Sequence, residues 1–107
     1  MKLLTKEIRK QLPPIGSQDG KDKDAIAYVK FFTPMSNWTW YVLEGEPVID
    51  KGKETDYLFF GLVYGFEREY GYFSLNELES VNRLGLGVER DRWFKPTRVG
   101  DCENPCE

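Results

Sequence analysis

The sequence contains no histidine, and its two cysteines, Cys102 and Cys106, both lie close to the C-terminal end. The absence of histidine excludes every mechanism that needs an imidazole base or an imidazole metal ligand. Two cysteines at one end cannot form the disulfide framework that holds a small secreted fold together. A structural zinc site would need two further ligands, so the cysteines predict neither a metal nor a cofactor.

Long apolar segments are also missing. The longest, residues 57–64, contains Gly61 and is far shorter than the roughly 20 residues of a membrane span. The N-terminal residues lack the apolar core of a secretory signal, so we expect a cytoplasmic protein with no membrane partner. The net charge of −3 gives neither the basic surface of a duplex-binding protein nor the acidic runs of a DNA mimic.

The 107 residues are 40% hydrophobic and 15% aromatic, and the aromatic share is high for a globular protein. This length suits one domain. We expect residues 1–100 to form a single α+β domain and residues 101–107 to be a disordered tail.

Two segments have the signals of helices. Residues 6–12 follow Thr5, a favourable N-cap, and Pro13 prevents their continuation. Their apolar positions are spaced by four residues: Leu4, Ile8 and Leu12. The second helix begins after Ser74, which forms a capping box with Glu77, and its inward residues are Leu75, Leu78 and Val81. We expect it to end near Gly85.

Four segments alternate like strands or are apolar on both faces: 25–33, 38–44, 57–66 and 70–73. The third should be central in the sheet, because both of its faces are apolar. Residues 45–56 are charged and are expected to be a loop with its tip at 50–53. The connections are too short for crossover helices, so the pattern predicts an antiparallel sheet of about four strands with both helices added.

Five short motifs, four of which contain aromatic residues, follow one another in a specific order: 28–34 (YVKFFTP), 36–41 (SNWTWY), 59–61 (FFG), 71–75 (GYFSL) and 89–91 (ERD). In these motifs the chain resembles the bacterial family called domain of unknown function 2958, over roughly residues 1–96. The resemblance implies a bacterial, cytosolic protein encoded on mobile elements such as plasmids and prophages. It supplies no catalytic residue.

The segment around Trp38 and Trp40 has two interpretations. The rings could stack on the bases of a single-stranded nucleic acid, together with Tyr28. They could instead build the core, and burial stabilises a small domain more than display does. We favour the core. Gly61 and Gly65 share one strand face and either line a ligand slot or are covered by a large ring, for which a tryptophan is the natural candidate.

Paired carboxylates occur at Glu67, Glu77 and Glu89, each with an acidic residue two positions later. A hydrolase would need two facing carboxyls in a desolvated pocket, and nothing in the sequence indicates one. We therefore expect these groups to be solvated or ion-paired, and we expect no enzymatic activity.

The sequence favours a non-catalytic interaction module that binds a protein partner and no small-molecule cofactor. A mobile-element accessory role follows from the resemblance only. The alternative is a single-stranded nucleic-acid binder that uses an aromatic sheet face. The residues predicted to form the interaction surface are Ser36, Asn37, Trp38, Trp40, Tyr41, Glu67, Glu89, Arg90 and Asp91.

Overall fold

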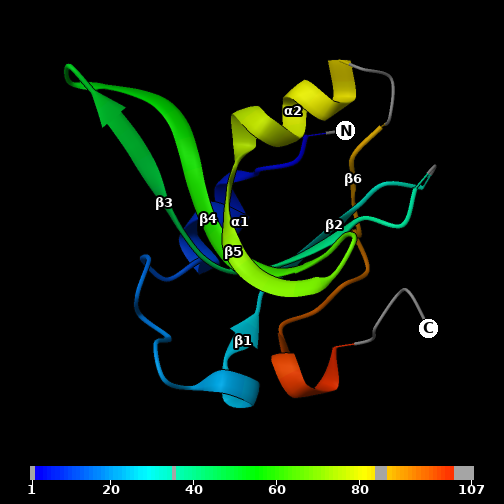
Figure 1. Cartoon of the computed structure of the whole chain (residues 1–107). Helices are drawn as coiled ribbons and strands as arrows, with labels where there is room; N and C mark the ends of the chain where they lie inside the picture. Colours follow the sequence, from blue (N-terminus) through cyan, green and yellow to red (C-terminus); the bar gives the residue numbers. More distant parts are fainter. Residues whose placement is uncertain (1, 35, 84–86, 103–107) are drawn as a thin grey trace.

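A computed structural model describes residues 2–34, 36–83 and 87–102. Its main feature is an antiparallel sheet with the strand order β5-β4-β3-β2-β6 (Figure 1). The strands are β2 (Val29–Phe32), β3 (Thr39–Asp50), β4 (Lys53–Tyr64), β5 (Arg68–Ser74) and β6 (Glu89–Arg90). The α+β class and the antiparallel sheet are confirmed. The count of about four strands is wrong, because β6 adds a fifth beside β2. A strand of two residues has no alternation that could mark it in the sequence.

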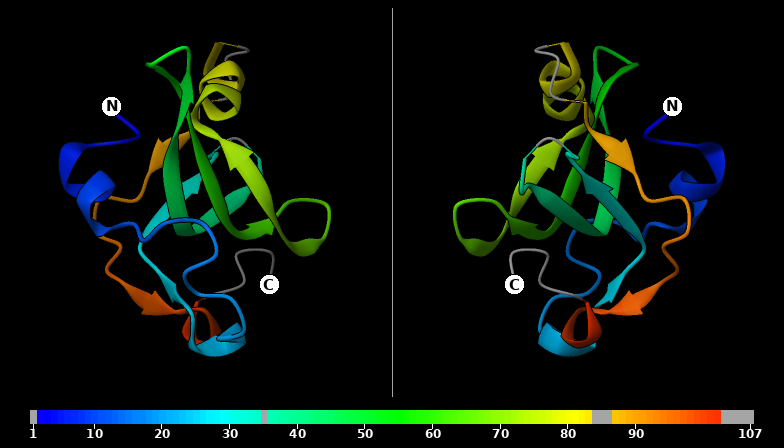
Figure 2. Two further views of the ribbon diagram at one scale, coloured as in Figure 1. Left: turned by 90° about the vertical axis from the view of Figure 1, so that its left-hand side faces the viewer. Right: turned by 90° about the vertical axis from the view of Figure 1, so that its right-hand side faces the viewer.

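A second, two-stranded sheet pairs β1 (Ile26–Ala27) with β7 (Thr97–Arg98). The segment 25–33, predicted to be one strand, is therefore divided between two sheets at Tyr28. Two short 3-10 turns, η1 (Asp22–Asp24) and η2 (Val99–Asp101), flank this small sheet. The backbone amide of Val99 donates to the carbonyl of Ala25 at 2.8 Å and so ties η2 to the start of β1. Figure 2 shows these parts gathered at the end of the molecule opposite α2 (Leu75–Arg83).

Strands β3 and β4 form one long hairpin of twelve residues on each side. The expectation that 45–56 is a loop is wrong, although its tip is where the sequence places it. Lys51 and Gly52 form the turn with φ angles of 51° and 79°, the left-handed pair of a tight hairpin turn. The charged residues beside the tip are exposed on both strands. A solvated hairpin arm and a loop therefore have the same polar composition.

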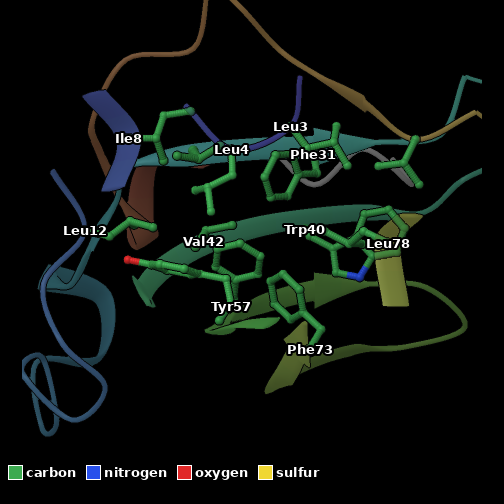
Figure 3. Packing of buried hydrophobic residues seen from close by; sticks show 13 residues of the cluster. Leu3, Leu4, Ile8, Leu12, Phe31, Trp40, Val42, Tyr57, Phe73 and Leu78 are labelled. Atoms are coloured by element: carbon green, nitrogen blue, oxygen red, sulfur yellow. The ribbon is translucent and has the colours of Figure 1, made fainter. Parts of the chain in front are cut away.

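The two helices, α1 (Lys6–Gln11) and α2, pack on one face of the sheet, called here the first face (Figure 3). Thr5 caps α1 by accepting a hydrogen bond from the amide of Ile8 at 3.2 Å, as predicted. The predicted stripes Leu4–Ile8–Leu12 and Leu78 are buried, and the expected helix end at Gly85 lies outside the described residues. This core, cluster 1, contains Leu3, Leu4, Ile8, Leu12, Val29, Phe31, Trp40, Val42, Tyr57, Phe59, Phe73, Leu78 and Val88.

The second face of the sheet carries a smaller core under β1 and η2. Its buried residues, cluster 2, are Ala25, Ala27, Tyr41, Leu43, Leu62, Tyr64 and Val99. A β-bulge between Val42 and Glu44 shifts the register of β3 against β4. Strict alternation would place Glu44 beside Val42 in cluster 1, whereas the bulge pairs Glu44 with Phe60, on the second face. Strand β5 contributes no described residue to cluster 2, and its Tyr70 and Tyr72 are exposed.

Candidate functional site

The structure separates the nine residues predicted to form one interaction surface. Ser36 and Asn37 are exposed in the β2–β3 connection, and Glu67 is exposed between β4 and β5. Trp40 is only 7% exposed and Tyr41 only 1%, and they belong to cores on opposite faces. Those two side chains are not available to a partner of the folded protein.

Trp38 and Trp40 build the core rather than a platform. Trp38 packs against cluster 1 and stacks on Trp40, with 5.9 Å between ring centroids. The Trp38 ring also occupies the space in which Gly65 would carry a Cβ, which confirms that a tryptophan covers this glycine. At Gly61 the same expectation is wrong, because a Cβ there would overlap the carbonyl oxygen of Tyr41. Gly61 therefore allows the backbones of β3 and β4 to approach at the bulge.

The remaining predicted residues lie around the short edge strand β6. Glu89 and Arg90 are partly buried and pair with Phe32 and Phe31 of β2. The Asp91 carboxylate lies 4.0 Å from the ammonium of Lys30 and accepts the amide of Trp93 at 2.9 Å. These contacts fix the chain after β6 and give Asp91 a structural role. Among the residues that the structure describes, no group of three acidic or cysteine side chains is placed to hold a metal ion.

An uncovered aromatic surface lies on the second face, where β4 meets β5. Tyr70 and Tyr72 are 42% and 64% exposed. The Phe60 ring contacts both of them and is nearly parallel to Tyr70 at 6.2 Å and tilted to Tyr72 at 5.0 Å. These three residues, the aromatic face, were not among the predicted site residues. The sequence contained a signal for this surface, because alternation along the predicted strand 70–73 puts Tyr70 and Tyr72 on one side.

Strand β5 is also an edge of the five-stranded sheet. It pairs with β4 through Ser74 to Arg68 without any register shift, and no strand of the described chain pairs with its other side. Arg68 begins the strand, donates to the Tyr64 hydroxyl at 3.1 Å and lies 5.8 Å from the ring of Tyr70. A regular strand with an open edge and exposed rings is thus presented to solvent.

A groove of about 230 Å³ separates this aromatic face from the loop that precedes β1. Its lining residues are Gln18, Asp19, Gly20, Asp22, Ala25, Leu43, Phe60 and Tyr70. One wall is therefore aromatic, and the other contains two acidic residues. This groove and the β5 edge together are the candidate site.

Two buried polar side chains hold the loop wall of the groove in place. Glu44, only 1% exposed, accepts the backbone amides of Gly16 at 2.7 Å and Gln18 at 2.6 Å. The Gln18 side chain in turn donates to the carbonyls of Ile26 and Leu43, each at 2.9 Å, and accepts the amide of Ile26. A buried carboxylate needs such compensation, and here the compensating donors are loop amides. The groove is therefore built into the fold.

Cys102 lies outside the candidate site. Its side chain packs against cluster 2, and burial raises the pKa of its thiol to about 11. A thiol that stays protonated at neutral pH is a poor nucleophile and a poor metal ligand. Cys106 lies outside the described residues.

The model of one protein family, described as protein of unknown function (DUF2958), matches residues 3–99. The chain belongs to this family. No curated protein and no solved structure matches this chain. The family description gives no activity, so the functional argument rests on the geometry of the β5 edge and the groove. Neither described helix is long and apolar enough to span a membrane.

Proposed function

We propose that this DUF2958 protein is a non-catalytic binding module that accepts an extended segment of a partner protein along β5. The observation that carries the proposal is the open edge of β5 beside exposed Tyr70 and Tyr72. A segment that pairs with β5 would extend the sheet to six strands. Its side chains on the second face would contact the aromatic face.

The edge of β5 lacks most features that protect sheet edges. Proteins shield such edges with prolines, bulges, very short strands or inward-pointing charges. Strand β5 has seven residues, no proline and an unbroken register with β4. By contrast, the opposite edge strand β6 has two residues. Backbone hydrogen bonds to an added strand supply affinity, and the side chains on alternate positions supply specificity.

Exposed aromatic rings are typical of binding surfaces. Tyrosine gives a large contact area with little loss of conformational entropy, and it is enriched at the centres of interfaces. Tyr72 is more exposed than Tyr70, and both rings project beside the strand that the partner would pair with. Burial of these rings by a partner would add apolar contact to the backbone pairing.

A single-stranded nucleic acid is the alternative partner, because bases also stack on sheet aromatics. The charge around the aromatic face favours protein. Asp19 and Asp22 line the adjoining groove, and Glu69 follows the one basic residue of β5, Arg68. Nucleic-acid binding needs a basic surface for the phosphates. The proposed role in mobile elements and in the bacterial cytoplasm is carried by the family resemblance only.

Selection from a library of displayed linear peptides tests the proposal. Peptides selected on the wild-type protein are expected to lose about tenfold or more in affinity for the Tyr70→Ser/Tyr72→Ser variant. The matched control is Phe66→Ser/Trp93→Ser, which removes two rings that are 95% and 91% exposed and lie outside the aromatic face. The control variant should bind as wild type does. Urea unfolding of both variants shows whether either fold is disturbed.

Three results would overturn the proposal. In the first, the selected peptides lose affinity for the control variant but not for the Tyr70→Ser/Tyr72→Ser variant. Another is tight binding of labelled single-stranded oligonucleotides that depends on Tyr70 and Tyr72, which would establish the nucleic-acid alternative. The third is a stable dimer in light scattering that dissociates on the β5 substitutions, because a second copy would then cover this edge.

A further inference from the structure

We infer that the groove beside β5 receives a basic side chain, lysine or arginine, of the segment that pairs with β5. The inference rests on the proposed function and specifies the chemistry of the partner. It follows from the composition of the two groove walls, from the charges around them and from the position of the groove beside the edge strand.

The charge of the groove is negative and uncompensated within the described chain. Asp19 and Asp22 line it, and neither forms an ion pair with a described residue. The nearby Asp24 differs, because its carboxylate contacts the guanidinium of Arg98 at 2.8 Å. The two lysines of the same loop, Lys21 and Lys23, do not line the groove. A cation in the groove would therefore lie beside two acidic residues.

The opposite wall offers aromatic faces to the same cation. Phe60 and Tyr70 lie nearly parallel, and both line the groove. Ring faces carry negative charge density and attract ammonium and guanidinium groups within about 6 Å. Arg68 already makes such a contact with Tyr70, at 5.8 Å, from outside the groove lining. An arrangement of carboxylates on one side and rings on the other suits a long basic side chain with an apolar stem.

The position of the groove selects for length as well as charge. A strand added to β5 would lie about 4.8 Å beyond it, and alternate side chains would point to the second face. Tyr70 belongs to the edge strand and lines the groove, so it lies between this added strand and the rest of the groove. The long apolar stem of a lysine or arginine suits a path across this ring better than a short side chain does.

The loop wall is preformed rather than created by the ligand. Glu44 and Gln18 hold its backbone through buried hydrogen bonds. Asp22 has a φ of 48°, in the left-handed region that aspartate and asparagine tolerate best among residues with a Cβ. An Asp22→Asn substitution therefore removes the charge without straining the backbone. Asp19 is an exposed loop residue and accepts the same change.

Titration with three synthetic peptides, followed by NMR chemical shifts, tests the inference. The peptides have the sequence acetyl-Thr-Val-X-Val-Thr-amide, with lysine, norleucine or glutamate at X. The lysine peptide is expected to bind at β5 about fivefold to tenfold more tightly than the norleucine peptide, and the glutamate peptide more weakly than both. Raising the salt from about 0.05 to about 0.5 M should reduce this preference.

The decisive variant is Asp19→Asn/Asp22→Asn, for which the lysine and norleucine peptides should bind equally. A matched control, Asp50→Asn/Glu79→Gln, removes the same charge from exposed residues outside the groove and should keep the preference. Equal binding of lysine and norleucine peptides to wild type, or a preference that survives in the groove variant, overturns the inference and leaves binding at β5 intact. Shift changes away from β5 for all three peptides overturn the proposed function itself.

Discussion

At the residue scale, Gly61 and Gly71 face each other across β4 and β5, but only one of the two positions has room for a side chain. A Cβ at Gly61 would overlap the Tyr41 carbonyl oxygen, whereas a Cβ at Gly71 would meet nothing within 4 Å. We expect Gly61→Ala to lose more than about 1 kcal/mol of unfolding free energy, because the bulged backbone of β3 must move. Gly71→Ala should gain about 0.5 kcal/mol, since alanine restricts the unfolded chain. Urea unfolding measures the stability of both variants. Equal effects on the free energy of unfolding would show that the close approach of the β3 and β4 backbones at Gly61 is not required.

Trp40 and Trp93 provide a second matched pair. Trp40 is 7% exposed within cluster 1, and Trp93 is 91% exposed. Trp40→Ala should lower the unfolding free energy by about 3 to 5 kcal/mol, because it leaves a large cavity. Trp93→Ala should change it by less than about 0.5 kcal/mol. Similar losses for both variants, measured by urea denaturation, would contradict the assignment of Trp40 to the core.

Cys102 should react slowly with alkylating reagents at neutral pH. Burial raises the pKa of its thiol to about 11, so the reactive thiolate forms only in strongly alkaline solution. The rate of iodoacetamide modification in a Cys106→Ser variant should rise with a midpoint near that pKa. Because the folded state holds this proton more tightly than the unfolded state, stability should fall as the pH rises from about 9 to about 11. A modification midpoint near the ordinary thiol value would mean that Cys102 is solvated.

At the element scale, α2 shows what local sequence can and cannot predict. Ser74 was predicted as its cap, and the Ser74 hydroxyl accepts the amide of Glu77 at 3.2 Å. A second acceptor comes from Asp56 of β4, whose carboxylate accepts the amide of Asn76 at 3.0 Å. No spacing rule connects residues 56 and 76, because the sheet brings them together.

These two caps predict how much unfolding free energy is lost when each acceptor is removed. Ser74→Ala and Asp56→Ala should each cost about 1 kcal/mol, because each leaves a different helix amide without its acceptor. The double variant should lose more than either single variant, as urea unfolding measures. No effect of Asp56→Ala would show that the contact from β4 contributes nothing to α2.

The long hairpin shows where composition misleads. Residues 45–56 are charged and turn-rich, and they were predicted to be a loop, yet they continue β3 and β4 to a tight turn at Lys51–Gly52. The sequence predicted the turn correctly because tight hairpin turns need left-handed φ angles, which glycine adopts readily. They could not show that exposed charged residues on both sides would pair as strands, because that pairing depends on the register set by the apolar half of the hairpin.

At the scale of the whole molecule, the candidate site was the part least predictable from the sequence. Alternation predicted that Trp38 and Trp40 share a face and build the core. It could not show which part of the second face stays open, because that depends on where β1, η1 and η2 pack. The groove combines Asp19, Asp22, Phe60 and Tyr70, which come from three separate segments. Only the folded chain brings them together.

The central claim is that β5 pairs with a strand of a partner, and hydrogen exchange of its backbone amides tests this most directly. The exchange rates would be measured by NMR for the protein alone and with a saturating peptide obtained by selection on the wild type. The account predicts that the outward amides of β5 exchange at least about tenfold more slowly in the complex, because the added strand accepts their hydrogen bonds. Unchanged exchange in β5, together with slower exchange at β6 or α2, would contradict it.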